Sequence, residues 1–435
     1  MQTAQNSQPG YYTPIPASLP HRPPFTASVG EKIAAFLAPL LGYIYTLFLF
    51  GEYSEQKWWL FGFSLGFLGL SELILFSKKR SLESYFWLFC LVVTLFGIAF
   101  GQNRVWGDMS WLFLHLFGGW YVFSRANAQL EGESGALLPM DAANAFFAFP
   151  FKNFILEVRV MVAAIKGNKK DASDNKKHSG IALFTFLAVL AGLILFIIAV
   201  NLLMDADPGF AEAAGKVFEI FRIDYIPEFF GRLIFAIPVG LYAFGMIAGD
   251  GRERSERLKA SSGRIRHAFS AMRKVPNLAY SIILAVFCVF YLLFFIMQGS
   301  YLFGAFFGKL PEGFIVSQYA RQGFFELCRV MTLNFALLWI VTQTGAKPVR
   351  EHLLTKTLCI TLLIESILFA AVAFSKLVLY ISSFGFTPLR LQSSWLVCVL
   401  FFGCLCAMYS ILRGKKSFKV FLLFSAVTLS ILCIY

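Results

Sequence analysis

Residues 278–297 read LAYSIILAVFCVFYLLFFIM, a run of twenty residues without a charged side chain. A helix needs about 20 apolar residues to cross the roughly 30 Å of hydrocarbon in a bilayer. A chain in lipid must satisfy its backbone hydrogen bonds internally, so this run predicts a transmembrane helix. Similar apolar stretches lie near residues 33–50, 58–76, 85–100, 106–123, 181–204, 230–248, 324–341, 357–381, 395–412 and 418–435. We therefore expect an all-α, polytopic transmembrane helical bundle of about 11 spans.

The composition agrees with a membrane protein. Hydrophobic residues make up 58% of the chain, above the roughly 45–50% that is usual for soluble proteins. The formal net charge of +13 invites a nucleic-acid interpretation. We reject that interpretation because the basic residues lie in short gaps beside apolar spans and not on one soluble face. No nucleic-acid partner is expected.

The distribution of lysine and arginine orients the bundle. Alternate gaps, beginning with the N-terminal segment, hold 28 of the 38 basic residues, whereas the intervening gaps hold 7. Loops rich in Lys and Arg remain on the cytoplasmic side of a membrane. The pattern therefore predicts a cytoplasmic N-terminus, an external C-terminus and an odd number of spans.

The gaps divide the chain into four parts. Residues 1–30 are rich in Pro and polar residues without an apolar period, which is typical of a disordered tail. Residues 31–124 are expected to form a four-helix front module. Residues 125–180 are expected to form a cytoplasmic linker, and residues 181–435 a seven-helix back module.

The linker contains an amphipathic segment. Its apolar residues recur at helical spacing, and they are Phe151, Phe154, Ile155, Val158, Met161, Val162 and Ile165. This pattern predicts a helix that lies on the cytoplasmic membrane surface. A second basic helix is expected within residues 250–275. Membrane lipids, with anionic lipid at these basic loops, are the expected partners, and an unknown protein partner is the alternative.

Several phrases of the back module resemble a known family. They are LLMDADPGF (202–210), GLYAFGMIAG (240–249), QYARQGFFEL (318–327) and FGFTPLRL (384–391). The sequence is similar here to bacterial multi-pass membrane proteins known only as a domain of unknown function, of the 4153/4173 type. The matching phrases span roughly residues 150–395, about half of the chain. The resemblance implies a protein of the bacterial inner membrane and supplies no activity.

Charged residues inside the apolar spans mark the candidate site. A charged side chain at mid-bilayer costs about 2.5–3.5 kcal/mol on insertion scales, so such residues must face protein or water. The spans near 324–341 and 357–381 are joined by a short loop and should pack as antiparallel neighbours. At about 1.5 Å rise per residue, we expect Arg329 to approach Glu365, and Glu326 to approach Lys376. A purely structural role for these pairs is equally compatible with the sequence.

A surplus of cations near the outer half of the back module indicates an anion site. Several arginines that converge there would suit a phosphate or a carboxylate, which the guanidinium fork matches well. The expected ligand-binding residues are Arg321, Arg329, Lys376, Arg390, Tyr319 and Asn334. Glu326 and Glu365 are expected as buried charge partners that position the cations or relay protons. Arg390 follows Pro388 in a turn and could instead serve as a head-group anchor.

The sequence contains no catalytic, nucleotide-binding or metal motif of sufficient specificity. The Gly-x-Ser-x-Gly match at residues 62–66 lies inside a span, where small residues serve helix packing. We therefore expect neither enzymatic activity nor a cofactor or metal. Two functions stay open. The protein could bind or translocate an anionic or amphiphilic solute at the charge cluster, or it could be a non-transporting regulatory or scaffold protein.

Overall fold

The structure is a computed structural model that describes residues 25–135, 137–166, 226–252, 275–303 and 323–435, with a few single residues between these ranges. Most of the expected disordered tail and the expected span near 181–204 lie outside the described residues. Most of the second basic helix also lies outside them. The described residues form helices and no named strand, as the all-α prediction requires.

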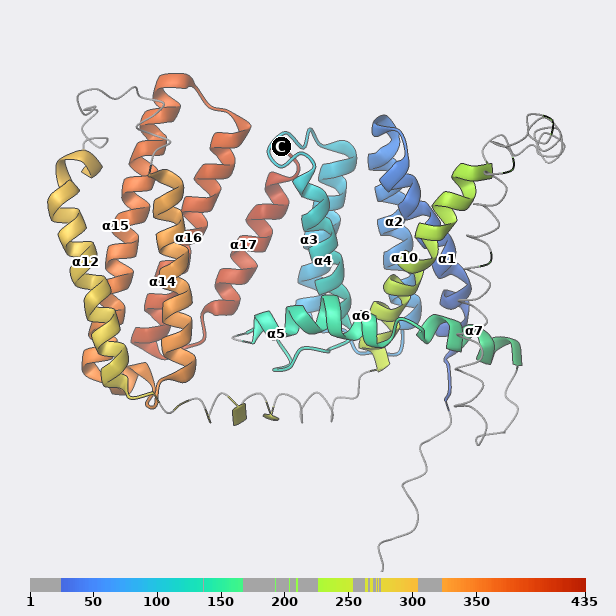
Figure 1. The fold of residues 1–435 in the computed structure, drawn as a ribbon, viewed down its shortest axis with the longest axis horizontal. Helices are drawn as coiled ribbons and strands as arrows, with labels where there is room; N and C mark the ends of the chain where they lie inside the picture. Colours follow the sequence, from blue (N-terminus) through green and yellow to red (C-terminus); the bar gives the residue numbers. More distant parts are fainter. Residues whose placement is uncertain are drawn as a thin grey trace, which may run out of the picture.

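Ten long helices of the described residues lie side by side (Figure 1). They are α1 Val29–Phe50, α2 Tyr53–Ile74, α3 Leu82–Phe100, α4 Met109–Arg125, α10 Ile226–Arg252, α12 Asn277–Phe303, α14 Phe324–Thr344, α15 Leu353–Phe384, α16 Pro388–Arg413 and α17 Phe418–Leu432. Seven of them, α1, α3, α10, α12, α14, α15 and α16, are long and apolar enough to cross a membrane. The protein is therefore a multi-pass membrane protein, and the count of about eleven spans stays a prediction.

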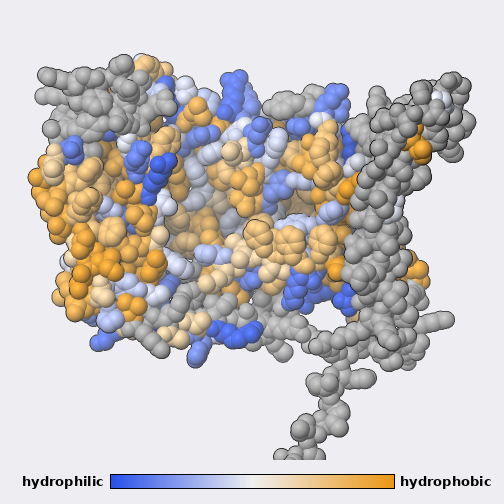
Figure 2. All heavy atoms as spheres, viewed as in Figure 1, coloured by the Kyte–Doolittle hydropathy of each residue, from blue (hydrophilic) through white to orange (hydrophobic). Residues whose placement is uncertain are grey.

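Exposed side chains agree with this assignment. Figure 2 shows a band of apolar side chains along the flanks of the helices, with hydrophilic side chains gathered toward the two ends. In α12, for example, Val286, Phe290 and Ile296 are all more than half exposed. A helix that exposes large apolar groups on its outer face is stable only where lipid covers them.

Local sequence signals set several helix ends. Ser28 caps α1, because its hydroxyl accepts from the Glu31 backbone at 3.1 Å and its own N–H donates to the Glu31 carboxylate at 2.8 Å. The same carboxylate pairs with Arg252 at 2.6 Å, which fastens the start of α1 to the end of α10. Helix α16 begins at Pro388 and ends before Gly414, whose φ of +70° favours glycine.

Helices α1–α4 and α10 share one apolar core, which we term the first cluster. Helices α1 and α10 pack through small residues, Ala38 and Gly42 on α1 with Ala236 and Gly240 on α10. Small residues spaced by four let two membrane helices approach closely, since no side chain separates their backbones. Helix α10, which follows the linker in the chain, thus packs in space against the helices of the expected front module.

Helices α12, α14, α15 and α16 form a second cluster with its own core. Helix α17 connects the two clusters, as Figure 1 shows, since it packs against α16 on one side and α3 on the other. The indole of Trp395 in α16 donates to Thr428 of α17 at 2.9 Å. At the chain end, the backbone N–H of Arg104 donates to the Tyr435 carbonyl at 3.2 Å.

Four short helices run across one end of the bundle (Figure 1). They are α5 Leu138–Ala143, the π-helix η1 Asn144–Ala148, α6 Phe149–Lys152 and α7 Leu156–Lys166. The predicted amphipathic helix is thus present as α7, but it begins only at Leu156 because α6 and a turn precede it. Phe147, Phe151 and Ile165 are 60% exposed or more, as expected of side chains that enter a membrane interface.

Candidate functional site

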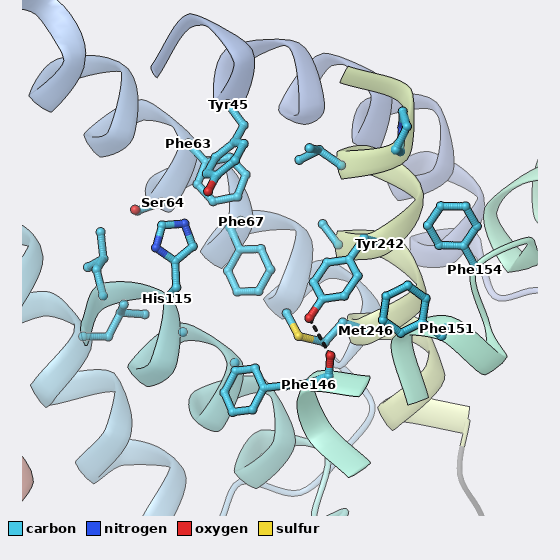
Figure 3. Close-up of a pocket in the computed structure, with 17 residues that line it drawn as sticks. Tyr45, Phe63, Ser64, Phe67, His115, Phe146, Phe151, Phe154, Tyr242 and Met246 are labelled. Carbon is cyan, nitrogen blue, oxygen red and sulfur yellow. Dashed lines mark hydrogen bonds between the residues drawn. The ribbon is translucent and has the colours of Figure 1, made fainter. Parts of the chain in front are cut away.

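An apolar cavity of about 450 Å³ lies within the first cluster. Helices α1, α2, α4 and α10 surround it, and η1 and α6 close one end (Figure 3). Its wall is dominated by large apolar side chains, chiefly Phe63, Phe67, Phe146, Phe151, Phe154 and Met246. A wall of this kind matches the apolar part of a ligand.

Two adjacent glycines of α4 leave space for the cavity. A Cβ on Gly118 would make an ordinary van der Waals contact with the ring of Phe67 at 3.7 Å, so this position in the cavity wall admits a Cβ without a clash. At Gly119 the ring of Phe146 occupies the place that a Cβ would take. Pro238 in α10 also lines the wall, and a proline inside a helix removes a backbone hydrogen bond and kinks it.

The π-helix η1 places Phe146 at the cavity. The hydroxyl of Tyr242 in α10 donates to the Phe146 carbonyl at 2.8 Å, as Figure 3 shows. This bond ties the interfacial segment to a spanning helix, and Phe146 covers Gly119 from the same side. Single-turn π-helices are frequent at functional sites, because the wider turn redirects side chains.

Few polar groups reach the cavity wall. Ser64 donates to the Leu60 carbonyl of its own helix at 2.8 Å. The Nδ1 of His115 lies 2.5 Å from the Trp111 carbonyl, which only accepts, so Nδ1 carries a proton. The Nε2 of His115 is buried without a hydrogen-bond partner among the described residues. In its neutral form this nitrogen is an acceptor available to a ligand.

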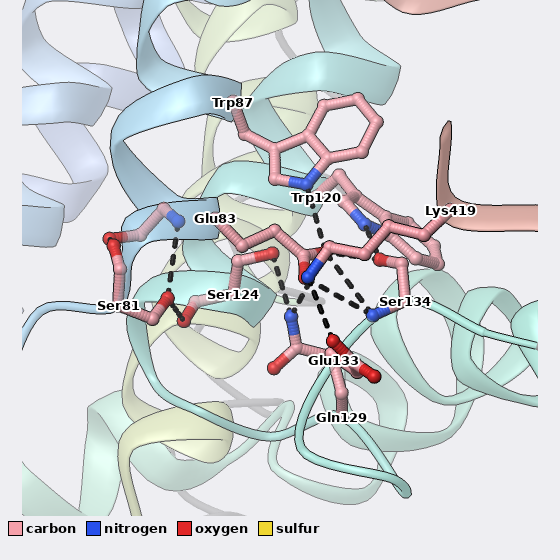
Figure 4. A network of polar contacts seen from close by, with 10 residues as sticks. Ser81, Glu83, Trp87, Trp120, Ser124, Gln129, Glu133, Ser134 and Lys419 are labelled. Atoms are coloured by element: carbon pink, nitrogen blue, oxygen red, sulfur yellow. Dashed lines mark hydrogen bonds and ion pairs between the residues drawn. The ribbon is translucent and has the colours of Figure 1, made fainter. Parts of the chain in front are cut away.

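A second polar centre lies where α3, α17 and the loop after α4 meet (Figure 4). Buried Glu83 accepts from the Trp87 indole at 3.2 Å and from both the backbone and the hydroxyl of Ser134. Lys419 lies 3.4 Å from Glu83 and 2.9 Å from Glu133. Its ammonium donates a hydrogen bond to the Glu133 carboxylate and thereby lowers the pKa of that carboxyl. The network fastens α17 to the first cluster.

A third group of charges joins α2, α4 and the loop between α2 and α3. Arg125, only 2% exposed, lies 3.1 Å from Glu72 and donates to the Lys78 carbonyl at 2.8 Å. The hydroxyl of Tyr121 also donates to Glu72, and Arg80 pairs with the same carboxylate at 2.6 Å. Both carboxylate oxygens of Glu72 thus have partners within the protein. This arrangement is typical of a structural contact between helices and leaves little of the carboxylate for a ligand.

The structure places the predicted anion ligands apart. Tyr319 and Arg321 lie outside the described residues. Arg329 and Glu326 are exposed on α14, whereas Lys376 of α15 is 1% exposed. Glu326 and Lys376 are near enough to interact electrostatically, as their spacing predicted.

The predicted approach of Arg329 to Glu365 is wrong. Glu365 is buried and its carboxyl reaches the Cys288 thiol of α12, while Arg329 faces outward from α14. The depth of each residue in its span could be predicted from the sequence. The rotation of each helix about its axis, which decides the direction of a side chain, could not be predicted.

Arg390 and Asn334 have structural partners. The guanidinium of Arg390 donates to the carbonyls of Phe384 and Gly385 and lies 4.2 Å from the ring centre of Tyr380. It therefore caps the end of α15, where helix carbonyls lack partners. Asn334, 1% exposed, accepts from Tyr291 and donates to Ser366, both at 2.9 Å.

The cavity was not predicted from the sequence. Its strongest local signal is the pair Gly118–Gly119 next to His115, in a span that is otherwise rich in aromatic residues. The remaining wall comes from α10 and η1, which are distant in the chain. The packing of α10 against α1, α4 and η1 brings these segments together.

These features define a helical multi-pass membrane protein with an apolar cavity in its first cluster of helices. The chain belongs to the family described as a domain of unknown function (DUF4153), whose family model matches residues 62–435. The matched part begins within α2, so it includes every wall residue of the cavity except Tyr45. The resemblance seen in the sequence is thereby confirmed. No curated protein and no solved structure matches the chain.

Proposed function

We propose that the protein binds the apolar chain of a membrane amphiphile in the cavity of the first cluster. The observation that carries this proposal is the cavity itself. Its volume of about 450 Å³ lies within the roughly 300–1,000 Å³ of small-molecule sites. Its wall offers few partners to water, so water gains little by entering. Lipid acyl chains surround any membrane protein and are the natural occupants.

Specificity for one amphiphile would come from shape and hydrogen bonding. An acyl chain gains no hydrophobic free energy when it moves from lipid into protein, because both surroundings are apolar. A buried acceptor without a partner costs about 1–3 kcal/mol, and a ligand that donates to it recovers that cost. The Nε2 of His115 is such an acceptor. We therefore expect an amphiphile with a hydroxyl or amide N–H close to its chain.

The proposal is tested by filling the cavity. The variant Gly118→Leu extends a side chain from the cavity wall beside Phe67, and Gly69→Leu adds the same group on α2, where a Cβ would meet no described residue within 4 Å. Both proteins are purified in lipid nanodiscs, and copurified amphiphiles are quantified by mass spectrometry. We expect one species to fall about tenfold, equivalent to about 1.4 kcal/mol, in Gly118→Leu alone. Equal lipid content in both variants would contradict the proposal.

The role of His115 is tested separately. His115→Phe retains a ring of similar size and removes the Nε2 acceptor. If the acceptor selects a donor-bearing amphiphile, this variant keeps an occupant in the cavity but loses the preference for that species. The readout is competition between a hydroxyl-bearing and a hydroxyl-free amphiphile of equal chain length. An unchanged preference excludes a selective role for His115.

We infer further that the protein has eleven spans in the bacterial inner membrane, with a cytoplasmic N-terminus, an external C-terminus and anionic lipid at its basic loops. Support comes from the loops 75–81, 345–352 and 414–417, which lie at the end of the bundle where α5–α7 run (Figure 1). All three contain lysine or arginine. Alkaline phosphatase fused after Tyr435 should be active, and a fusion after Arg125 should be inactive. The reverse result overturns the orientation.

A further inference from the structure

Glu365 lies near the middle of α15, within the second cluster and away from the cavity. Helices α12, α14 and α16 all pack against α15. The side chain is 6% exposed, and its Oε2 is buried without a hydrogen-bond partner among the described residues. A carboxyl group in this position needs either a cation or a proton, because an unpaired charge in an apolar interior is very costly.

The described helices around Glu365 supply no cation. Helix α12 contains no Asp, Glu, Lys, Arg or His, and α16 contains only Arg390 and Arg413, at its two ends. On α14 the charged residues are Glu326 and Arg329, both exposed in the first two turns. The salt bridges within the described part of the chain do not include Glu365.

The lysines of α15 itself are remote. Lys356 precedes Glu365 by nine residues and Lys376 follows it by eleven, which at 1.5 Å per residue is about 14 Å and about 16 Å along the helix. Lys376 instead interacts electrostatically with Glu326. Neither lysine can therefore neutralise the carboxyl group directly.

The groups that face Glu365 are neutral. The thiol of Cys288 on α12 reaches the carboxyl group, and Tyr291 lies one turn further along the same helix. The other titratable side chains in the core of this cluster are the phenol of Tyr280 and the thiols of Cys328, Cys359 and Cys404. A thiol or a phenol does not compensate a negative charge at neutral pH.

A chain of neutral hydrogen bonds runs beside the carboxyl group. Tyr291 donates to Asn334 at 2.9 Å, and Asn334 donates to Ser366 at 2.9 Å. Ser366 in turn donates to the Leu362 carbonyl at 2.8 Å. The hydroxyls of Tyr291 and Ser366 and one N–H of Asn334 are thus already used within the chain.

We propose that Glu365 is a proton-binding site, in which the carboxyl group holds a proton at neutral pH inside the second cluster. Loss of that proton leaves an uncompensated charge between α12 and α15. Deprotonation is therefore coupled to a movement of these helices or to the entry of water. The site lies outside the amphiphile cavity, so this proposal does not depend on the proposed function.

Dicyclohexylcarbodiimide tests the site chemically, because this apolar reagent reacts with protonated carboxyl groups. The acid proton moves to one nitrogen of the reagent, and a carboxyl oxygen forms a bond to its central carbon. The adduct then transfers the acyl group from oxygen to nitrogen and gives a stable N-acylurea. No group leaves and no oxidant is needed, so the peptide gains the full mass of the reagent.

The full-length protein in nanodiscs is treated at several pH values, and labelled peptides are mapped by mass spectrometry. An ordinary exposed glutamate is protonated in about one molecule in 500 at pH 7. We therefore expect labelling of Glu365 to exceed that of exposed Glu326 at least about tenfold, and to fall as the pH rises. Labelling of Glu365 that is no greater than that of Glu326 counts against the site.

Infrared spectroscopy covers the case in which the reagent does not reach Glu365. The band of protonated carboxyl groups at neutral pH should lose one component in Glu365→Gln, while the components of Asp141 and Glu157 remain. The whole band should persist in Glu326→Gln. Glutamine is close in shape to the neutral acid, so the first variant should fold normally. A spectrum that Glu365→Gln leaves unchanged overturns the proposal.

Discussion

Gly240 of α10 lies against the backbone of α1 at Ala38, where a Cβ on the glycine would be only 2.8 Å from the carbonyl oxygen. On the other side of the same contact, Gly42 faces the backbone of Ala236. Each helix thus presents two small residues four apart to its partner. This contact explains why a helix from the second half of the chain completes the wall of a cavity formed by the first helices.

Enlarging Gly240 should separate α1 from α10. The variant Gly240→Leu forces a side chain into backbone, and overpacking of this kind costs about 1–3 kcal/mol. The matched control is Gly231→Leu on the same helix, where a Cβ would meet no atom of the described part of the chain within 4 Å. Thermal unfolding in detergent should show a lower Tm for Gly240→Leu and a near-native Tm for Gly231→Leu. Equal Tm values in the two variants would show that the close contact does not matter for stability.

The ion pairs of Lys419 should contribute unequally. Its contact with Glu83 joins side chains that are 35% and 5% exposed, whereas its shorter contact with Glu133 joins groups that are 35% and 50% exposed. Exposed pairs contribute about 0.2–1 kcal/mol, because water screens them and side-chain entropy opposes them. Partial burial should raise the coupling of Lys419 to Glu83 to about 1–3 kcal/mol.

Double-mutant cycles measure both couplings. The first cycle combines Lys419→Met with Glu83→Gln, and the second combines it with Glu133→Gln, with the free energy of unfolding as the readout. Because α17 connects the two clusters, the first cycle should also show faster hydrogen exchange in α17 for Lys419→Met. A larger coupling for Glu133 than for Glu83 would contradict the argument from burial.

The interfacial helices should become less firmly attached as the pH rises. Burial raises the pKa of Asp141 to about 7, with the nearby charges of Glu131 and Glu83 adding to the effect. Burial also raises the pKa of Glu157 to about 8. Between about pH 4 and the raised values, the folded protein binds protons that the unfolded chain has released, so stability falls as the pH rises.

Hydrogen exchange of residues 138–166 is the appropriate measurement. We expect protection to be greatest near pH 4, after correction for the intrinsic exchange rate, and to decrease until about pH 8. In Asp141→Asn combined with Glu157→Gln, no proton is released and the decrease should disappear. Protection that grows with pH in the native protein would mean that these carboxylates are stabilised as anions.

The sequence predicts the fold better than the site, for a physical reason. An apolar run specifies a spanning helix by itself, and the run at 278–297 is indeed helical within α12, which extends over Asn277–Phe303. Burial of Glu365 also follows from its position inside such a run. Its partner does not follow, because Cys288 comes from another helix and its contact depends on the rotation of both.

The cavity required information that no single segment contains. Gly118 and Gly119 mark a gap in the surface of α4, but α10 and η1 supply the other walls of the cavity. Tyr242 and Phe146 are 96 residues apart in the chain, so their contact could not be predicted from the sequence. The charged residues of the back module were the stronger sequence signal for a site. In the structure, however, Arg390 contacts the carbonyls at the end of α15, and Asn334 contacts Tyr291 and Ser366.

The charges around Glu72 provide a test of burial against distance. Arg80 is the nearer arginine at 2.6 Å, but its side chain is 44% exposed, whereas Arg125 lies at 3.1 Å and is 2% exposed. Removal of one partner from a buried pair costs about 3–5 kcal/mol, because the other charge stays behind without compensation. Glu72 is 31% exposed, so we expect the lower end of that range, about 3 kcal/mol, for Arg125→Met.

Arg80→Met is the matched control, and it should leave the free energy of unfolding almost unchanged despite the shorter contact. Arg125→Lys should recover only part of the loss, because lysine cannot contact Glu72 and the Lys78 carbonyl with the same fixed fork. The free energies of unfolding of the three variants are compared in one lipid mixture. If Arg80→Met lowers the free energy of unfolding most, then distance and not burial determines the strength of the contacts of Glu72. In that case the exposed contact with Arg80 is the one that holds the loop between α2 and α3.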